Sequence, residues 1–311
     1  MPQSKAEALT VNALVKQYKA EKMPRRASTQ RSYESWLNNY VLPHWGDAPL
    51  TDAQARPVEL WLQSLKLSPK SKLHIRGLLR VLWDYAMWAG HVPTARNPME
   101  LVSVKGTTHR TRKPRSLTAQ EFQQLLSSVG DDVCFRTFVL IAVSFGLRIS
   151  EVLGLKWQDV NWLEKTINIE RGVVKQIVDD VKSRHSAKTM VIDDGLLDVL
   201  KHWRQSTEFY KPEDWIFASP VKLGRQPLSY MGVWKTLSDA SKKAGLGHLS
   251  SHTFRHTHRT WLDSVGTPVG VQRQMMRHSD IRTTMNIYGD APTEEMRGAH
   301  KKIVNIALAS A

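Results

Sequence analysis

One stretch in the first half of the chain, residues 103–116, most limits how this protein can fold. It reads SVKGTTHRTRKPRS, with no acid and almost no apolar side chain. Such a segment cannot add to a hydrophobic core, so we expect an extended linker between two separately folded regions. Its lysines and arginines are Lys105, Arg110, Arg112, Lys113 and Arg115. Because these charges repel one another unless an anion is present, we favour a strap along a phosphate backbone over a solvated loop.

The charge of the whole chain also favours an anionic partner. Lysine and arginine number 44 against 29 aspartates and glutamates, a net charge of +15 in 311 residues. Nucleic acid is favoured over a membrane, since no apolar run could span a bilayer and no basic amphipathic helix with an apolar anchor stands out. The single cysteine, Cys134, excludes a disulfide framework within the chain and favours a reducing, cytoplasmic compartment, where the protein would associate with the nucleoid.

Residues 1–102 are expected to form a bundle of about four helices, because apolar residues recur there at helical spacing. Ser28 and Thr51 are candidates to open the second and third helices. Ser68, followed by a proline, begins the last helix, and Gly90 ends it.

That last helix carries a basic stripe. Lys72, Arg76 and Arg80 recur every four residues, and no acid follows until Asp84. The stripe is either a solvated helix face or, as we slightly favour, a DNA contact.

Residues 117–311 open with Thr118 and Glu121, a capping box that starts a new helix. Further helices are expected near 133–145, in GLRISEVLGL, and near 194–205, 230–244, 252–264, 268–276, Tyr288 and 293–308. Two β-rich pieces, 166–174 and 189–193, should pair as an antiparallel hairpin with the polar KQIVDDVKSRHSAK at its tip. The predicted fold class is therefore mainly α with a small antiparallel β-sheet or hairpin.

A cluster of histidines and arginines in SHTFRHTHRTW, residues 251–261, is the first candidate site. His252 and His256 have the spacing of a zinc-binding pair, but a threonine stands where a zinc protease has its glutamate, and no third ligand follows. His252 and Arg255 share another helix face, and an imidazole beside a guanidinium suits a phosphodiester. We therefore favour a phosphate site with no metal.

Five motifs together resemble the tyrosine recombinase (phage-type integrase) family. In chain order they are GLRISE, KSRHSAK, HTFRH, RHSDIRTTM and IYG. The resemblance covers the whole chain, because 1–102 and 103–116 are similar to that family's helical core-binding (DNA-binding) domain and interdomain strap, and 117–311 to its catalytic domain. Each motif alone is a weak or moderate signal, whereas all five in this order are a strong one.

The resemblance implies a role for each matching residue. Tyr288 would be the nucleophile that forms a 3′-phosphotyrosyl bond. Arg148 and Arg255 would neutralise the pentavalent transition state. His252 would accept or donate a proton near the tyrosine, and His278 would donate a hydrogen bond to a phosphate oxygen.

A lysine of the hairpin would protonate the 5′-hydroxyl leaving group. We assign Lys182 to this role, with Lys175 and Lys188 as rivals. The predicted tip is long and holds two acids, Asp179 and Asp180, which leaves the choice among the lysines open.

Two further residues bear on the arginines. Glu151 would support the arginines or His252 from behind. The family often has Leu-Gly before the second histidine, where this chain has Met276 and Arg277. The added charge of Arg277 could contact DNA or alter the turn.

The function implied is that of a site-specific DNA recombinase or integrase of a phage or other mobile element, needing no metal, ATP or other cofactor. Its partners would be double-stranded DNA with specific recombination sites, further copies of itself in a tetramer on DNA, and DNA-bending accessory proteins. The alternatives are a type IB topoisomerase or dimer-resolving enzyme, a non-catalytic DNA-binding relative and an unrelated basic metallohydrolase.

Overall fold

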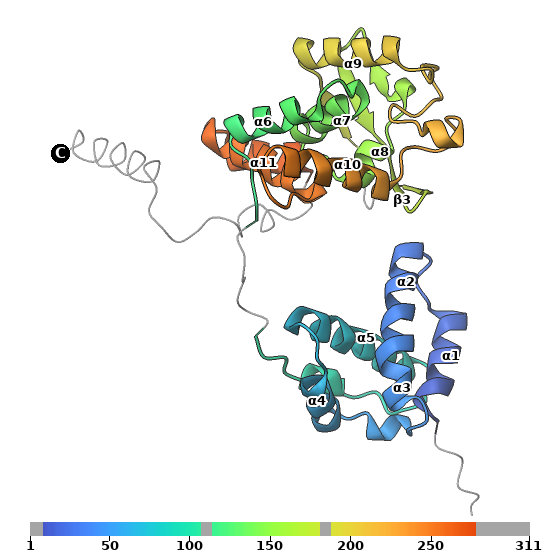
Figure 1. The fold of residues 1–311 in the computed structure, drawn as a ribbon. Coiled ribbons are helices and arrows are strands. Elements are labelled where there is room, and N and C mark those ends of the chain that lie inside the picture. The colour runs from blue at the N-terminus through green and yellow to red at the C-terminus, as the bar shows by residue number, and fades with distance from the viewer. Residues whose placement is uncertain (1–8, 107–113, 181–187, 278–311) are drawn as a thin grey trace, which may run out of the picture. The chain divides into compact units, whose positions relative to one another are not determined.

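The computed structural model describes residues 9–106, 114–180 and 188–277. It divides into two compact units, Met1–Lys113 and Pro114–Ala311 (Figure 1). Both are mainly helical, and the second adds small antiparallel sheets, so the predicted fold class is confirmed. Among the described residues, none of the helices is both long and apolar enough to cross a lipid bilayer.

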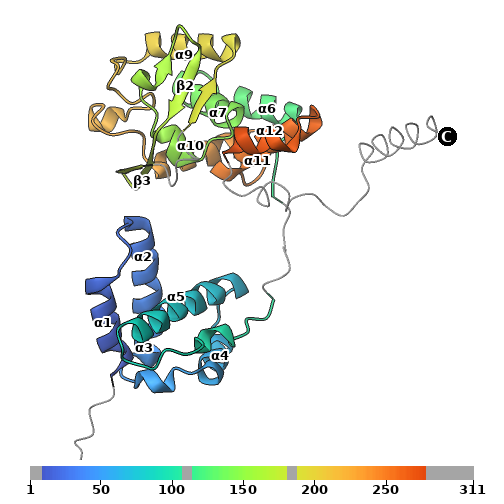
Figure 2. The ribbon, with the colours of Figure 1, turned by 180° about the vertical axis from the view of Figure 1, so that it is seen from behind.

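The first unit is a helical bundle around one apolar core. Its helices are α1 (Val11–Glu21), α2 (Ala27–Trp36), α3 (Leu42–Trp45), α4 (Ala55–Ser64) and α5 (Pro69–Trp88). The long helix α5 packs against α1 and α2 (Figure 2). It begins as predicted, with the Ser68 hydroxyl accepting the amide of Ser71 at 3.2 Å. The predicted starts at Ser28 and Thr51 are wrong, because α2 begins one residue before Ser28 and a 3₁₀ turn, Leu50–Asp52, precedes α4.

The basic stripe of α5 is engaged by the segments on either side of the helix. Lys72 donates to the carbonyl of Gln63 at 3.0 Å, and Arg76 to the carbonyl of Val102 at 2.9 Å. Arg80 pairs with Glu100 at 2.9 Å. The Arg76 and Arg80 contacts dock the segment after α5 onto this helix, whereas Lys72 ties α5 to α4. The charge of Arg80 already faces a carboxylate. The DNA contact of this stripe stays a prediction.

The second unit is built around α7 (Val133–Ser144), whose residues are buried on most sides. The other helices are α6 (Ala119–Val129), α8 (Ile149–Leu153), α9 (Asp194–Ser206), α10 (Tyr230–Lys243), α11 (Ser251–Ser264) and α12 (Val269–Met276). Helices α6, α8, α9 and α11 all pack against α7 (Figure 1). The predicted capping box is confirmed, because Thr118 and Glu121 each accept the other's amide, at 2.8 and 3.1 Å.

Two sheets stand where one hairpin was predicted. Strands β1 (Val160–Asn161), β2 (Thr166–Ile169) and β5 (Lys188–Val191) form an antiparallel sheet in the order β1-β2-β5. Strands β3 (Arg171–Val174) and β4 (Ile177–Asp180) form a separate hairpin. The predicted pairing is thus confirmed only for β2 with β5. The prediction of a polar tip is wrong in part, because the segment 175–188 contains strand β4.

Close packing against α8 holds the β3–β4 hairpin in place. A Cβ atom on Gly154 would lie 2.5 Å from the carbonyl oxygen of Arg171, so only glycine allows this approach. The guanidinium of Arg171 also donates to the Gly154 carbonyl at 3.2 Å and to Asp159 at 2.6 Å. The hairpin is therefore tied to the same short helix that carries Glu151.

Candidate active site

Arg148 lies at the turn between α7 and α8, and a glycine makes this turn possible. Gly146 has a φ of +57°, and a Cβ atom there would lie 2.6 Å from the ring of His258. Arg148 caps α8, since its amide donates to one Glu151 oxygen and its guanidinium to the other, both at 2.8 Å. The Arg148 side chain remains 41% exposed. Glu151 thus fixes the guanidinium through Nη1, while the Arg148 side chain stays partly exposed.

Helix α11 brings a second guanidinium to this turn. Arg255 is buried and donates to the carbonyl of Gly146 at 2.5 Å and to the carbonyl of Met276 at the end of α12. Burial, and then the charge of Arg148, lower the pKa of Arg255 to about 9, so the guanidinium is charged at neutral pH. The Gly146 carbonyl that Arg255 binds lies two residues before Arg148, so both arginines meet at this turn.

His252 lies one turn before Arg255 on α11 and is exposed. Partial burial and the charges of Arg255 and Arg148 lower the pKa of its imidazole. The ring is therefore neutral at physiological pH and can accept a proton. The three predicted residues thus form one polar group with two cations and one base.

Arg277 does not face solvent, as a DNA contact would require. Its φ of +52° is the left-handed conformation that the end of α12 needs and that glycine adopts most easily. The side chain is 0% exposed and donates to Glu151 at 2.5 Å. It also approaches the sulfur of Met190 at 3.2 Å. Of the two expectations for this residue, burial of the side chain argues against the contact with DNA.

Glu151 is the buried anion at the centre of these arginines. Burial acts to raise its pKa, but the charge of Arg277, the amide of Arg148 and the charge of Arg148 together outweigh burial. The pKa of Glu151 is therefore below its usual value, and the carboxylate is ionised. Sequence reasoning placed Glu151 behind the arginines but did not find its partner Arg277, which lies far along the chain.

Comparison with known proteins then identifies the family. The model of the phage integrase family matches residues 115–295. The chain belongs to this family of tyrosine recombinases. The prediction of a site-specific tyrosine recombinase enzyme is thereby confirmed.

Relatives of the recombinase include named integrases. A tyrosine recombinase XerC-like protein of Caldanaerobacter subterraneus is 24% identical over 302 residues, covering 87% of this chain and 76% of the relative. The ICEBs1 integrase of Bacillus subtilis is 24% identical over 241 residues, covering 73% and 63%. The chain thus spans a little under two thirds of the latter protein's length.

Solved structures share the fold. The Tn1549 transposon integrase in complex with a circular intermediate DNA matches with a TM-score of 0.79 at 20% identity, covering 96% of this chain and 100% of that chain. A lambda integrase tetramer bound to a Holliday junction matches with a TM-score of 0.70 at 18% identity, covering 93% and 80%.

The remaining predicted site residues of the recombinase lie partly outside the described ranges. Lys182, His278 and Tyr288 are outside them, as are the linker residues Arg110, Arg112 and Lys113. The rival Lys175 is exposed at the tip of the β3–β4 hairpin, and Lys188 opens β5 opposite Ile169. Of the other linker residues, Lys105 is exposed, and Arg115 pairs with Glu121 at 2.6 Å.

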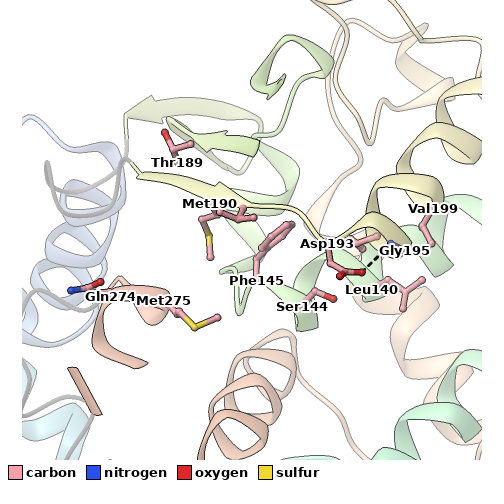
Figure 3. Close-up of a pocket in the computed structure, with 12 residues that line it drawn as sticks. Leu140, Ser144, Phe145, Thr189, Met190, Asp193, Gly195, Val199, Gln274 and Met275 are labelled. Carbon is pink, nitrogen blue, oxygen red and sulfur yellow. Dashed lines mark hydrogen bonds between the residues drawn. The ribbon is translucent and has the colours of Figure 1, made fainter. Parts of the chain in front are cut away.

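A pocket of about 790 Å³ lies between strand β5, helix α12 and the start of α9 (Figure 3). Its walls come from the end of α7, strand β5, the start of α9 and helix α12, and Met190 lines it while also touching Arg277. Of the described residues that line it, none is a lysine or an arginine, so this part of the lining does not suit a phosphate. Within the described ranges, no three histidine, cysteine, aspartate or glutamate side chains gather as they would around a metal ion.

His258, in the same cluster of α11, is buried and supports Gly146. Burial is the main cause that lowers its pKa to about 4; a hydrogen bond to Val143 opposes the shift, and nearby arginines add to it. In the unfolded chain a histidine has a pKa near 6.5. The unfolded state therefore binds a proton between pH 6.5 and pH 4 that the folded state does not.

We predict that this difference lowers the free energy of unfolding as the pH falls from 6.5 to 4, by about 3 kcal/mol at most. Urea unfolding at a series of pH values would measure it. His258→Gln should flatten the slope, while His202→Gln, at an exposed position on α9, should leave it unchanged. Equal slopes for all three proteins would contradict the prediction. The lowered pKa of His252 acts in the same direction, so the comparison between variants isolates His258.

Proposed function

We propose that this recombinase cleaves and rejoins double-stranded DNA at specific recombination sites, in the integration and excision of a phage or other mobile element. The observation that carries the proposal is that Arg148, held by Glu151, and Arg255, bound to the Gly146 carbonyl, meet at the turn before α8, with His252 one turn from Arg255 on α11. Two guanidiniums beside a neutral imidazole suit a phosphodiester under attack.

The reaction assigns one task to each residue. The phenolic oxygen of Tyr288 attacks phosphorus and its proton passes to His252, while the bond to the 5′-oxygen breaks. That oxygen takes a proton from Lys182, and the 3′-phosphotyrosyl bond keeps the strand ready for rejoining by the reverse attack. Arg148, Arg255 and His278 would stabilise the non-bridging oxygens.

The geometry of Arg255 supports its proposed role in stabilising the non-bridging oxygens. A guanidinium carries five N–H donors in a fixed plane. The bonds to the carbonyls of Gly146 and Met276 set that plane without exhausting its donors. A phosphate oxygen approaching Arg148 would then meet a second guanidinium that is already oriented.

The first unit and the linker would hold the DNA. The contacts we propose are Lys72, Arg76, Arg80, Lys105, Arg110, Arg112, Lys113 and Arg115. Relatives with this fold are described as bound to circular intermediate DNA and, as a tetramer, to a Holliday junction. On that support we propose a tetramer on DNA in the cytoplasm, assisted by DNA-bending proteins.

The test is covalent trapping in EDTA. Nicked duplexes tiled from the DNA that flanks this protein's gene would be incubated with the wild type or with Tyr288→Phe and run on denaturing gels. We expect a protease-sensitive shifted band at one position, with the wild type only. Adducts at every position would favour a type IB topoisomerase. An adduct with Tyr288→Phe would exclude this nucleophile, and intact binding with no adduct on any tile would favour a non-catalytic DNA-binding protein.

A further inference from the structure

Arg277 occupies a position that is unfavourable for an arginine in two ways. Its backbone is in the left-handed region, where a side chain is strained, and its guanidinium is 0% exposed. A buried charge is costly unless a partner compensates it. A favourable interaction must therefore offset the backbone strain and the burial of the charge, and the contacts of Arg277 show which interaction does so.

Those contacts are to a carboxylate that the active site already uses. One oxygen of Glu151 accepts from Arg277 at 2.5 Å and from the amide of Arg148 at 2.8 Å, and the other oxygen accepts from the Arg148 guanidinium at 2.8 Å. Glu151 therefore lies between a solvent-facing arginine and a buried one. Its own side chain is only 5% exposed.

Without Arg277, the carboxylate would oppose the task of Arg148. A phosphate that approaches the Arg148 guanidinium also meets the negative charge of Glu151 directly behind it, and in a buried site this repulsion is only weakly screened. Arg148, Arg255 and Glu151 together carry a net charge of one positive unit. Arg277 brings the group to two, which better matches the charge that builds on the phosphate oxygens during the reaction.

We propose that Arg277 is a positioning residue for strand transfer, which compensates Glu151 from the protein interior so that Arg148 keeps its charge and orientation for the phosphate. The proposal rests on the proposed function. It assigns Arg277 no contact with DNA, because the side chain is buried.

The first experiment separates the chemical step from DNA binding. The single-turnover rate of adduct formation at saturating DNA and the Kd for the same DNA would be measured for the full chain. Arg277→Met removes the charge and replaces the arginine by an apolar side chain of roughly similar shape. We expect its rate to fall about 10- to 100-fold, with little change in Kd.

Rescue distinguishes charge compensation from simple packing. Adding Glu151→Gln to Arg277→Met removes the uncompensated anion, but it also removes one acceptor of the Arg148 guanidinium. The double variant should therefore be faster than Arg277→Met without reaching the wild-type rate, and Arg277→Lys should keep much of the wild-type rate. The control Arg225→Met makes the same change at an exposed position and should behave as the wild type. All rates would be normalised to the folded fraction, and if Arg277→Met does not fold, the double and lysine variants carry the test. A wild-type rate for Arg277→Met, or a double variant that is no faster than the single one, would overturn the proposal.

A second measurement does not depend on cleavage. Inorganic phosphate should raise the melting temperature of the wild type more than that of Arg277→Met, and the response of the double variant should lie between the two. Equal responses, or none with the wild type, would overturn the proposal. If the wild type forms no adduct, the proposed function fails while the phosphate response still decides the role of Arg277.

Discussion

Replacing Arg255 by lysine is expected to lower the rate of covalent adduct formation by about a thousandfold, with a much smaller loss of DNA affinity. The guanidinium of Arg255 bridges two carbonyls, on Gly146 before α8 and on Met276 at the end of α12. An ammonium group is a point charge that cannot span both and still present a flat pair of donors to a phosphate. Because lysine keeps the positive charge, the loss of rate would measure the contribution of the guanidinium's shape and hydrogen bonds.

The rate would be measured in single turnovers at saturating DNA on the site found by trapping. Arg259→Lys is the matched control, because Arg259 lies one turn later on α11, is also buried and pairs with Asp263 at 3.4 Å. The control should change stability and leave the chemical step nearly intact. If Arg255→Lys cleaved within tenfold of the wild type, or if both variants lost activity equally, Arg255 would have no special place at the phosphate.

The features of the fold that depend only on residues close together in the chain were predictable from the sequence. Thr118 with Glu121, and Ser68 before a proline, mark helix starts because a cap depends on residues three apart. The helix that carries His252 and Arg255 was also foreseeable, since the predicted range 252–264 matches α11, Ser251–Ser264. Such features need no knowledge of the rest of the chain.

The predictions failed where the local structure depends on a contact with a distant residue or on an unusual backbone conformation. The β3–β4 hairpin turns at Lys175 and Gln176, both with positive φ, where glycine and asparagine are the usual signals. The contact of Arg80 with Glu100 could not be foreseen either, because that carboxylate lies outside α5. The role of Arg277 was equally hidden, because a charged residue before a histidine reads as a surface contact. The roles of Tyr288, Lys182 and His278 rest on the family resemblance and stay predictions.

Glu151→Gln is expected to lower the free energy of unfolding of the second unit by about 3–5 kcal/mol. The change leaves the fully buried guanidinium of Arg277 with a neutral amide in place of its anionic partner, and it removes the anion that holds Arg148. A buried ion pair adds little net stability over apolar residues, but removing one member leaves the other uncompensated.

Urea unfolding of the full chain would measure this, with Glu121→Gln as control, since Glu121 also caps a helix and pairs with an arginine but lies nearer the surface, its side chain 25% exposed. The control should lose only about 1 kcal/mol. The pKa of Glu151 is below its usual value in the folded state, so its contribution is present above about pH 4.5 and is lost as the pH falls further. The gap between wild type and Glu151→Gln should therefore narrow in acid. A gap no larger than that of Glu121→Gln at neutral pH would show that Arg277 does not depend on this carboxylate.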